Sequence, residues 1–223
     1  DLDLFHTSES LPFDDRDKVS RPKYFERVGP ESFQSRNVTR LGFEKHNGRG
    51  MATLDYDRDG DLDLVIAEHP RNTVFDIQFY ENKGSGDGNW LGVRVTKSDG
   101  GPALGGRVEI DTGEETVVRW VNPRTDFFSQ ESRLVHVGLG DREAVEEVRV
   151  VWPDGTTKRL SDVAANQKLV VSPGNVTRLD GTASDDGGGL LPFTLPSGGA
   201  VLGRVTHGLA DPAGGVLRTL GAR

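Results

Sequence analysis

Five aspartates alternate with other residues along one short stretch of the chain, residues 55 to 65, which reads DYDRDGDLDLV. The five are Asp55, Asp57, Asp59, Asp61 and Asp63. Carboxylates this close repel one another, so a fold that orders them needs a positive counter-charge. Ca²⁺ supplies such a charge and takes about six to eight oxygen ligands from carboxylates, backbone carbonyls and water. The stretch therefore predicts a calcium site with these five aspartates as its metal residues.

The spacing Asp-x-Asp-x-Asp-Gly matches the beginning of an EF-hand loop, in which a glycine at the sixth position permits a sharp turn. The remainder of the loop differs. Ile66 stands at the twelfth position, where an EF-hand has a bidentate glutamate, and Asp63 at the ninth position can close the site instead. After the loop, Leu62, Leu64 and Ile66 alternate with other residues, which predicts a strand and not a helix.

The expected ligands are four side chains and one backbone group. They are the carboxylates of Asp55, Asp57, Asp59 and Asp63 and the backbone carbonyl of Asp61. Mg²⁺ suits this loop less well, because it demands tight octahedral geometry and gives up water reluctantly. The alternative is an acidic, solvated turn that binds no metal.

The other residues whose side chains could take part in catalysis do not form a recognisable catalytic set. We therefore predict no catalytic residues, no cofactor-binding residues and no enzymatic activity. Ser129, Asp126 and His136 have the residue types of a hydrolytic triad, but the sequence contains no G-x-S-x-G nucleophile motif. The histidines lack the spacing of a zinc site. His46 and His69 flank the acidic stretch and could support its ligands from outside.

Three tryptophans are candidates for carbohydrate binding, and two asparagines are candidates for N-glycosylation. Trp90, Trp120 and Trp152 alternate with aliphatic residues, which favours core packing over a carbohydrate-binding platform. Asn37 and Asn175 each begin an Asn-x-Thr pattern that fits N-glycosylation.

The composition narrows the class of protein. The 223 residues include 29 glycines and 11 prolines and are 34% hydrophobic, which is typical of turn-rich β-structure. A net charge of −8 argues against a nucleic-acid partner, and the absence of cysteine excludes disulfides and thiolate chemistry. No apolar run is long enough to predict a membrane span. Weak calcium sites are useful where calcium is abundant, so we expect an extracellular or cell-surface location.

The chain divides into three expected segments. Residues 1–85 hold calcium-binding repeats of which the first is incomplete, residues 86–173 form a second β domain, and residues 174–223 are a glycine-rich linker with a C-terminal extension. The repeat is visible in residues 1–5, DLDLF, and residues 61–65, DLDLV. We therefore expect the sequence to be a piece of a longer protein.

Two family resemblances support this division. Residues 46–82, with NGRGMATLDYDRDGDLDLVIAE and the later FYEN, resemble an FG-GAP (VCBS-type) repeat, the blade unit of integrin-like β-propellers. Residues 89–171 are similar to the ASPIC/UnbV domain, through NWLGVRV, LGGRVEI, FFSQESRLVHVGLGD, VEEVRVVWPDGT and LSDVAANQKLVV. The order is typical of secreted proteins of the cartilage acidic protein type, and the lack of cysteine favours a microbial relative. The resemblances imply calcium in the acidic loop and an all-β fold, with partial propeller-like repeats before a β-sandwich-like domain.

The expected function is that of a non-enzymatic, calcium-binding extracellular protein that mediates adhesion or contact with a protein, glycan or matrix partner. One alternative is a subunit of a filament or oligomer, in which unpaired sheet edges are completed by strand exchange between chains. A second alternative is an accessory domain of a secreted enzyme.

Overall fold

The computed structural model describes residues 3–7, 22–38, 43, 48–68, 76–83, 88–122, 125–126, 129–180, 209–210 and 216–219. Every regular element within these ranges is a β-strand, so the prediction of an all-β chain is confirmed. Within the same ranges, no helix has the length and apolar character needed to cross a membrane.

The N-terminal part contains two sheets. The first has the order β1-β2-β3 and is antiparallel, with strands β1 (Leu4–His6), β2 (Lys23–Gly29) and β3 (Ser32–Arg36). The second has the order β17-β18-β6-β5-β4. Its strands are β4 (Gly48–Leu54), β5 (Asp63–Glu68), β6 (Asp76–Glu81), β17 (Leu209–Ala210) and β18 (Val216–Thr219). The C-terminal strand β18 therefore adds to the edge of a sheet that is built from residues far earlier in the chain.

A small core lies on one face of β5 and β6. Leu64 and Ile66 on β5 and Tyr80 on β6 are buried there together with Val38 and Phe43, as the alternation of a strand requires. The ring centroids of Phe43 and Tyr80 are 4.4 Å apart. Phe5, Tyr24 and Met51 pack against this cluster.

The C-terminal part also contains two sheets, each of four strands. One has the order β12-β7-β15-β16, with β7 (Asn89–Val95), β12 (Val135–Gly140), β15 (Gln167–Val171) and β16 (Val176–Asp180). The other has the order β14-β13-β8-β9, with β8 (Arg107–Asp111), β9 (Thr116–Trp120), β13 (Ala144–Val151) and β14 (Thr157–Ala164). Every pairing in these two sheets is antiparallel except that of β15 with β7, which is parallel.

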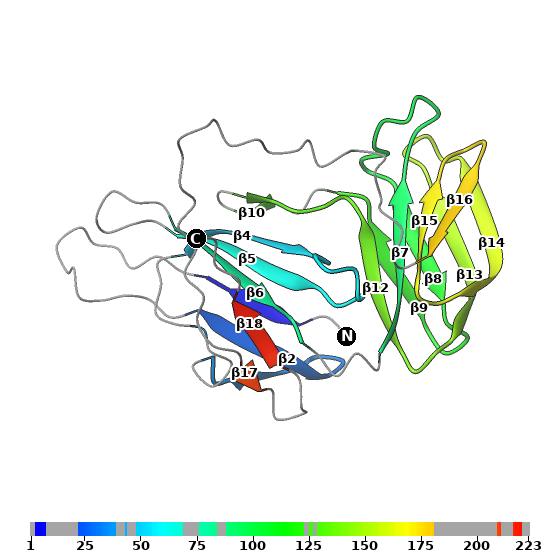
Figure 1. The fold of residues 1–223 in the computed structure, drawn as a ribbon. Coiled ribbons are helices and arrows are strands. Elements are labelled where there is room, and N and C mark those ends of the chain that lie inside the picture. Colours follow the sequence, from blue (N-terminus) through cyan, green and yellow to red (C-terminus); the bar gives the residue numbers. More distant parts are fainter. Residues whose placement is uncertain are drawn as a thin grey trace.

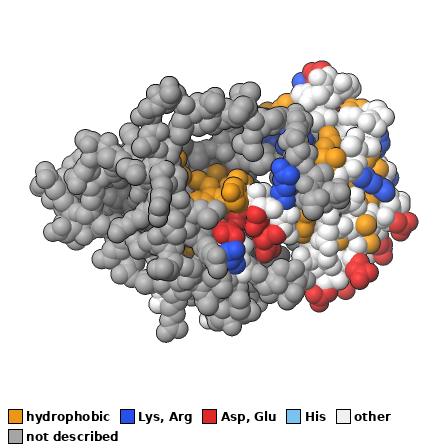
Figure 2. Space-filling view, in the orientation of Figure 1, with side chains coloured by type: hydrophobic (Ala, Val, Ile, Leu, Met, Phe, Trp, Pro, Cys, Tyr) orange, Lys and Arg blue, Asp and Glu red, His pale blue; other side chains and the backbone are white. Residues whose placement is uncertain are grey.

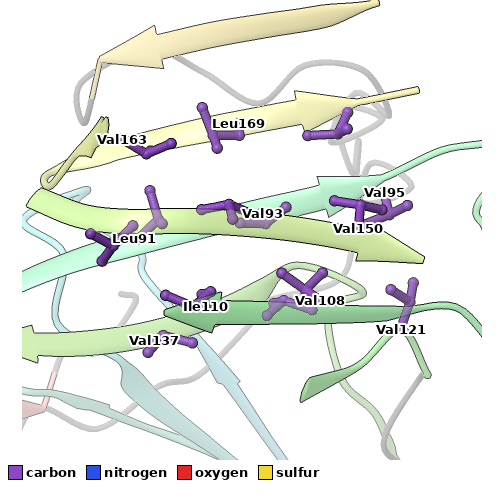
Figure 3. Close-up of a cluster of buried hydrophobic side chains, with 14 of the residues drawn as sticks. Leu91, Val93, Val95, Val108, Ile110, Val121, Val137, Val150, Val163 and Leu169 are labelled. Carbon is purple, nitrogen blue, oxygen red and sulfur yellow. The ribbon is translucent and has the colours of Figure 1, made fainter. Parts of the chain in front are cut away.

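A large core joins the two sheets of the C-terminal part. Leu91 and Val93 on β7, Val108 and Ile110 on β8 and Leu169 on β15 are fully buried and belong to one cluster. Figure 3 shows these side chains between the strands. Full burial of each such side chain stabilises the fold by about 1.5–3 kcal/mol, so this core is the main source of stability in the described residues.

The two parts of the chain lie side by side, and the loop between β4 and β5 points toward β7 and β12 (Figure 1). A short hairpin, β10 (Thr125–Asp126) with β11 (Ser129–Gln130), reaches back from the C-terminal part to β4. The acidic stretch is thus the tip of one part and is directed at the other.

Candidate metal centre

The acidic stretch forms the loop that closes the hairpin of β4 and β5. The last cross-strand pair before the loop is Leu54 opposite Asp63. Within the loop, Arg58 (φ 69°) and Gly60 (φ 98°) have positive φ angles. Positive φ is uncommon for arginine and ordinary for glycine, and it turns the chain back toward β5.

The aspartates of this loop accept hydrogen bonds from the loop's own backbone. The N–H of Gly60 donates to Oδ1 of Asp55 (3.4 Å), and the N–H of Asp59 donates to Oδ1 of Asp57 (3.4 Å). The N–H of Asp61 donates to Oδ1 of Asp59 (2.9 Å). Local bonds of this kind are typical of aspartate in turns, and they fix the direction of each carboxylate.

Three of the five carboxylates converge. Asp55, Asp57 and Asp59 each present an oxygen within 4.8 Å of the other two. The side chain of Asp55 is only 4% exposed, and its Oδ2 accepts no hydrogen bond in the described part of the chain, although the ammonium of Lys168 lies 3.3 Å from it. Three carboxylates that converge in this way, one of them buried, fit a hard divalent cation, which prefers oxygen ligands.

Burial, and repulsion within the loop, raise the pKa of two of its aspartates. Burial raises the pKa of Asp59, and the charges of Asp57 and Asp61 raise it further. Burial also raises the pKa of Asp61, with additional contributions from Asp55 and Asp57. The ionised loop is therefore costly without a cation, because like charges at this separation each disfavour the charged form of the other.

Asp63 is placed differently from the converging three. It is 1% exposed, and its Oδ2 accepts the N–H of Tyr56 (2.7 Å) while its Oδ1 accepts the N–H of Asn82 (2.8 Å). Burial raises its pKa to about 6, although both backbone hydrogen bonds lower it. In the structure Asp63 thus ties the beginning of the loop to the residue that follows β6. Its role as a ligand stays a prediction.

The C-terminal part holds the loop at Gly60. Nε2 of His136 lies 2.9 Å from the carbonyl oxygen of Gly60, and the His136 ring stacks on Trp90 with ring centroids 5.6 Å apart and 14° between the planes. Burial lowers the pKa of His136, so the ring is neutral at pH 7 and its Nε2–H donates to the carbonyl. The ammonium of Lys168 lies 3.3 Å from Oδ2 of Asp55 and 5.7 Å from the centre of the Trp90 ring.

A second contact joins the two parts along β4. The hydroxyl of Ser129 accepts the N–H of Met51 (3.0 Å) and donates to the Met51 carbonyl. Beside it, the hydroxyl of Thr53 donates to Oε1 of Glu131 (3.2 Å). The Ser129 hydroxyl therefore bonds to both backbone groups of Met51 on β4, as the backbone of a neighbouring strand would.

These contacts show whether Ser129 and His136 form part of a hydrolytic triad. The Ser129 hydroxyl and the Nε2 atom of His136 are both bonded to backbone groups of the N-terminal part, and neither bonds to the other. The side chain of Asp126 lies outside the described residues. The structure thus assigns Ser129 and His136 to the junction between the two parts.

The tryptophans divide into two groups. Trp90 and Trp152 are buried, at 5% and 4% exposure, whereas Trp120 is 58% exposed on β9, with the guanidinium of Arg107 6.0 Å from its ring centre. Of the two glycosylation patterns, Asn175 lies exposed between β15 and β16 with its Nδ2 3.4 Å from Oγ1 of Thr177. Asn37 is also exposed, but the threonine of its pattern is outside the described residues.

His46 and His69, which flank the acidic loop in the sequence, both lie outside the described residues. The residues that contact the loop from the C-terminal part are instead Trp90, His136 and Lys168, and none of them was predicted to do so. A signal for Lys168 was present, because a lysine between buried strand positions needs a partner of opposite charge. No signal in the sequence indicated that the partner is more than a hundred residues away.

With the geometry established, the class of the C-terminal part follows from comparison with known families. Residues 96–178 match the family model described as ASPIC and UnbV, so this part of the chain carries the ASPIC/UnbV domain. The predicted resemblance is confirmed for this domain, whereas the FG-GAP repeat stays a prediction.

The chain is also similar to cartilage acidic protein 1 from three animals. It is 30% identical to the Xenopus tropicalis protein over 128 residues, 27% identical to the Mus musculus protein over 142 residues and 29% identical to the Homo sapiens protein over 109 residues. The aligned regions cover 56%, 61% and 48% of this chain, but 20%, 21% and 16% of the relatives. The chain thus spans about a fifth of the length of the curated relatives that it matches.

Proposed function

We propose that this chain is part of an extracellular, non-enzymatic protein in which a calcium-binding loop stabilises a β-structure that mediates adhesion or contact with a protein or matrix partner. The observation that carries the calcium proposal is the convergence of Asp55, Asp57 and Asp59, whose carboxylate oxygens lie within 4.8 Å of one another. Similarity to cartilage acidic protein 1 supports the extracellular location.

The ion in this proposal has a structural role. Asp55, Asp57 and Asp59 would hold it, and the carbonyl of Asp61 and the carboxylate of Asp63 are the further ligands that the sequence predicts. When bound, it supplies positive charge that offsets both the burial and the repulsion that raise the pKa of Asp59 and Asp61. The loop would then remain ordered between β4 and β5.

We further propose that β4, β5 and β6 form a blade of the FG-GAP type and that the two sheets of the ASPIC/UnbV part form a sandwich. The antiparallel order of β4, β5 and β6 with the acidic loop between the first two supports the blade. The single large core shared by both sheets of the C-terminal part supports the sandwich.

The partner surface in this proposal is the outer face of the β4–β5–β6 sheet, opposite the small core. Its apolar side chains are Ala52, Leu54, Val65, Ala67, Ile77 and Phe79, with Tyr56 against Phe79. Ile77 is 58% exposed and Tyr56 is 56% exposed, which is unusual for large side chains gathered on one face. Figure 2 shows hydrophobic and acidic side chains next to one another on the visible face of the described chain.

Calcium binding is tested with the double variant Asp57→Asn and Asp59→Asn, because asparagine keeps the local hydrogen-bond acceptor and removes the charge. Isothermal titration should show calcium binding to the wild-type chain and none to the variant. At free calcium about a hundredfold above Kd, the wild-type Tm should rise by about 5–10 °C. A wild-type melting curve that is identical in EDTA and in calcium refutes the structural role.

The matched control is Asp99→Asn with Asp154→Asn. These two exposed carboxylates also accept a backbone N–H two residues further on, from Gly101 and Thr156, both at 2.8 Å. The control changes the net charge by the same amount as the loop variant. It should bind calcium like the wild type.

Self-association is a second candidate function, favoured by the same outer face and by the pairing of β18 with β6 at a sheet edge. A strand that adds to the edge of its own sheet can also add to the edge of a neighbouring chain. Sizing at several protein concentrations in calcium tests this candidate. An oligomer that Ile77→Asp dissociates supports it, and a monomer at every concentration excludes it.

A further inference from the structure

Lys168 is the most deeply buried charged group that faces the acidic loop from the ASPIC/UnbV part. It lies on β15, opposite Gly92 of the parallel strand β7, and it is 6% exposed. Its neighbour Leu169 points into the large core, so strand alternation directs Lys168 to the other face of the sheet. That is the face against which the acidic loop lies.

Gly92 provides the space for the lysine stem. A Cβ at Gly92 would lie 3.2 Å from Cγ of Lys168, which is closer than ordinary van der Waals contact. The stem can therefore lie across β7 and carry the ammonium to Trp90 and Asp55. The ammonium lies 5.7 Å from the Trp90 ring centre, and this contact favours a cation.

In the described residues the ammonium forms one ion pair, with Oδ2 of Asp55 at 3.3 Å, and the two side chains are 7% and 4% exposed. A buried ammonium without a carboxylate would be strongly unfavourable, and so would a buried carboxylate without a cation. The carboxylate that compensates Lys168 is also one of the three that converge in the candidate metal centre.

We propose that Lys168 is a built-in counter-ion of the acidic loop that weakens cation binding there, so that the ASPIC/UnbV part sets the metal affinity of the neighbouring repeat. The inference rests on the proposed function, in which the loop binds calcium. Without metal, the ammonium neutralises Asp55 and keeps the loop attached to β7 and β15. When calcium is present, the same ammonium repels it and reduces its affinity.

The sign of this effect follows from the charges. A calcium ion held by Asp55 would lie within a few ångströms of the ammonium, and the surrounding protein screens this repulsion only partly. Replacing Lys168 by methionine keeps most of the volume and removes the charge. Calcium should then bind at least about tenfold more tightly, whereas the metal-free chain should be less stable because Asp55 is left without its counter-charge.

A purely structural lysine predicts the opposite change in affinity. If Lys168 only positioned Asp55, its removal would disorder a ligand and weaken calcium binding. The direction of the change in Kd therefore separates the two roles, and stability alone does not.

The experiment compares the full chain with Lys168→Met, Lys168→Gln and the control Lys158→Met. Lys158 is a half-buried lysine whose ammonium lies 3.4 Å from the carbonyls of Ser172 and Pro173, away from the loop. Calcium Kd is measured by isothermal titration, and Tm is measured in EDTA and in saturating calcium. Lys168→Gln keeps a donor toward Asp55 without the charge, and it serves if the methionine variant does not fold.

Tighter binding in a Lys168 variant, together with a lower Tm in EDTA and a larger gain in Tm from calcium, supports the proposal. Unchanged or weaker binding overturns it while the calcium proposal stands. If the wild type binds no calcium and a Lys168 variant does, the counter-ion role of Lys168 is supported. The calcium proposal for the native chain then fails, because the ammonium takes the place of the metal ion. If neither binds calcium, both proposals fail.

Discussion

The indole ring of Trp90 occupies the space that a side chain at Gly60 would need. A Cβ built on Gly60 would lie 1.9 Å from Nε1 and 2.2 Å from Cδ1 of Trp90. The backbone at Gly60 also has a φ of 98°, which side chains rarely adopt. Glycine is therefore required at the sixth position of the loop by the bend and also by the close approach of a second domain.

Gly60→Ala should accordingly destabilise the chain by about 3 kcal/mol or more, because it combines backbone strain with displacement of a buried, stacked ring. Chemical denaturation monitored by tryptophan fluorescence gives the free energy of unfolding. The control is Gly155→Ala, at a φ of 85° with no atom within 4 Å of the added Cβ, which should cost about 1 kcal/mol. Equal losses in the two variants would show that the loop is not docked on Trp90.

The individual strands of this fold could be predicted from the sequence, whereas the pairing between distant strands could not. Alternation of apolar residues predicted strands such as β7 and β13, because a strand places successive side chains on opposite faces regardless of its partner. The parallel pairing of β15 with β7 was not predictable in this way, since the register joins Lys168 to Gly92 across most of the domain. Pairing between distant strands depends on the whole core and leaves no local pattern.

The candidate site shows the same division. The acidic loop could be located from the sequence because its carboxylates lie close together in the chain, and the structure places oxygens of Asp55, Asp57 and Asp59 within 4.8 Å of one another. Whether they hold a metal stays a prediction. The contacts of the loop with His136 and Lys168 were not predictable, because each depends on how two parts of the chain that are distant in sequence meet. Asp63 could be assigned to the loop from its spacing, but its hydrogen bond to the N–H of Asn82 required the position of β6.

Asp63→Ala should expose the amides of Tyr56 and Asn82 to exchange. Both N–H groups donate to the Asp63 carboxylate, and a donor left without a partner in a buried site costs about 1–3 kcal/mol. Relief of the unfavourable burial that raises the Asp63 pKa offsets part of this loss, so we expect a net destabilisation of about 2 kcal/mol. Hydrogen exchange followed by NMR in EDTA should show at least about tenfold faster exchange at these two amides.

The control for Asp63 is Asp99→Ala. Asp99 accepts the N–H of Gly101 at 2.8 Å, but it lies in an exposed turn, where water replaces the lost acceptor. Its loss should change exchange only locally and leave the free energy of unfolding within about 0.5 kcal/mol of the wild type. Undiminished protection of the Tyr56 and Asn82 amides in Asp63→Ala would rule out the role of Asp63 as their shared acceptor.

His136 should make the stability of the chain depend on pH. Burial lowers its pKa in the folded state below the ordinary value of 6.5, and Lys168 lowers it further, whereas the Gly60 carbonyl and Asp55 oppose this shift. The unfolded chain therefore binds a proton more readily than the folded chain, so stability is present above about pH 6.5 and is lost as the pH falls below it. Denaturation in EDTA from pH 7.5 to 5.5 should show this loss relative to His136→Gln, which keeps a donor for Gly60 and does not titrate. Parallel pH profiles for the two proteins would contradict the burial of a neutral His136 at the junction.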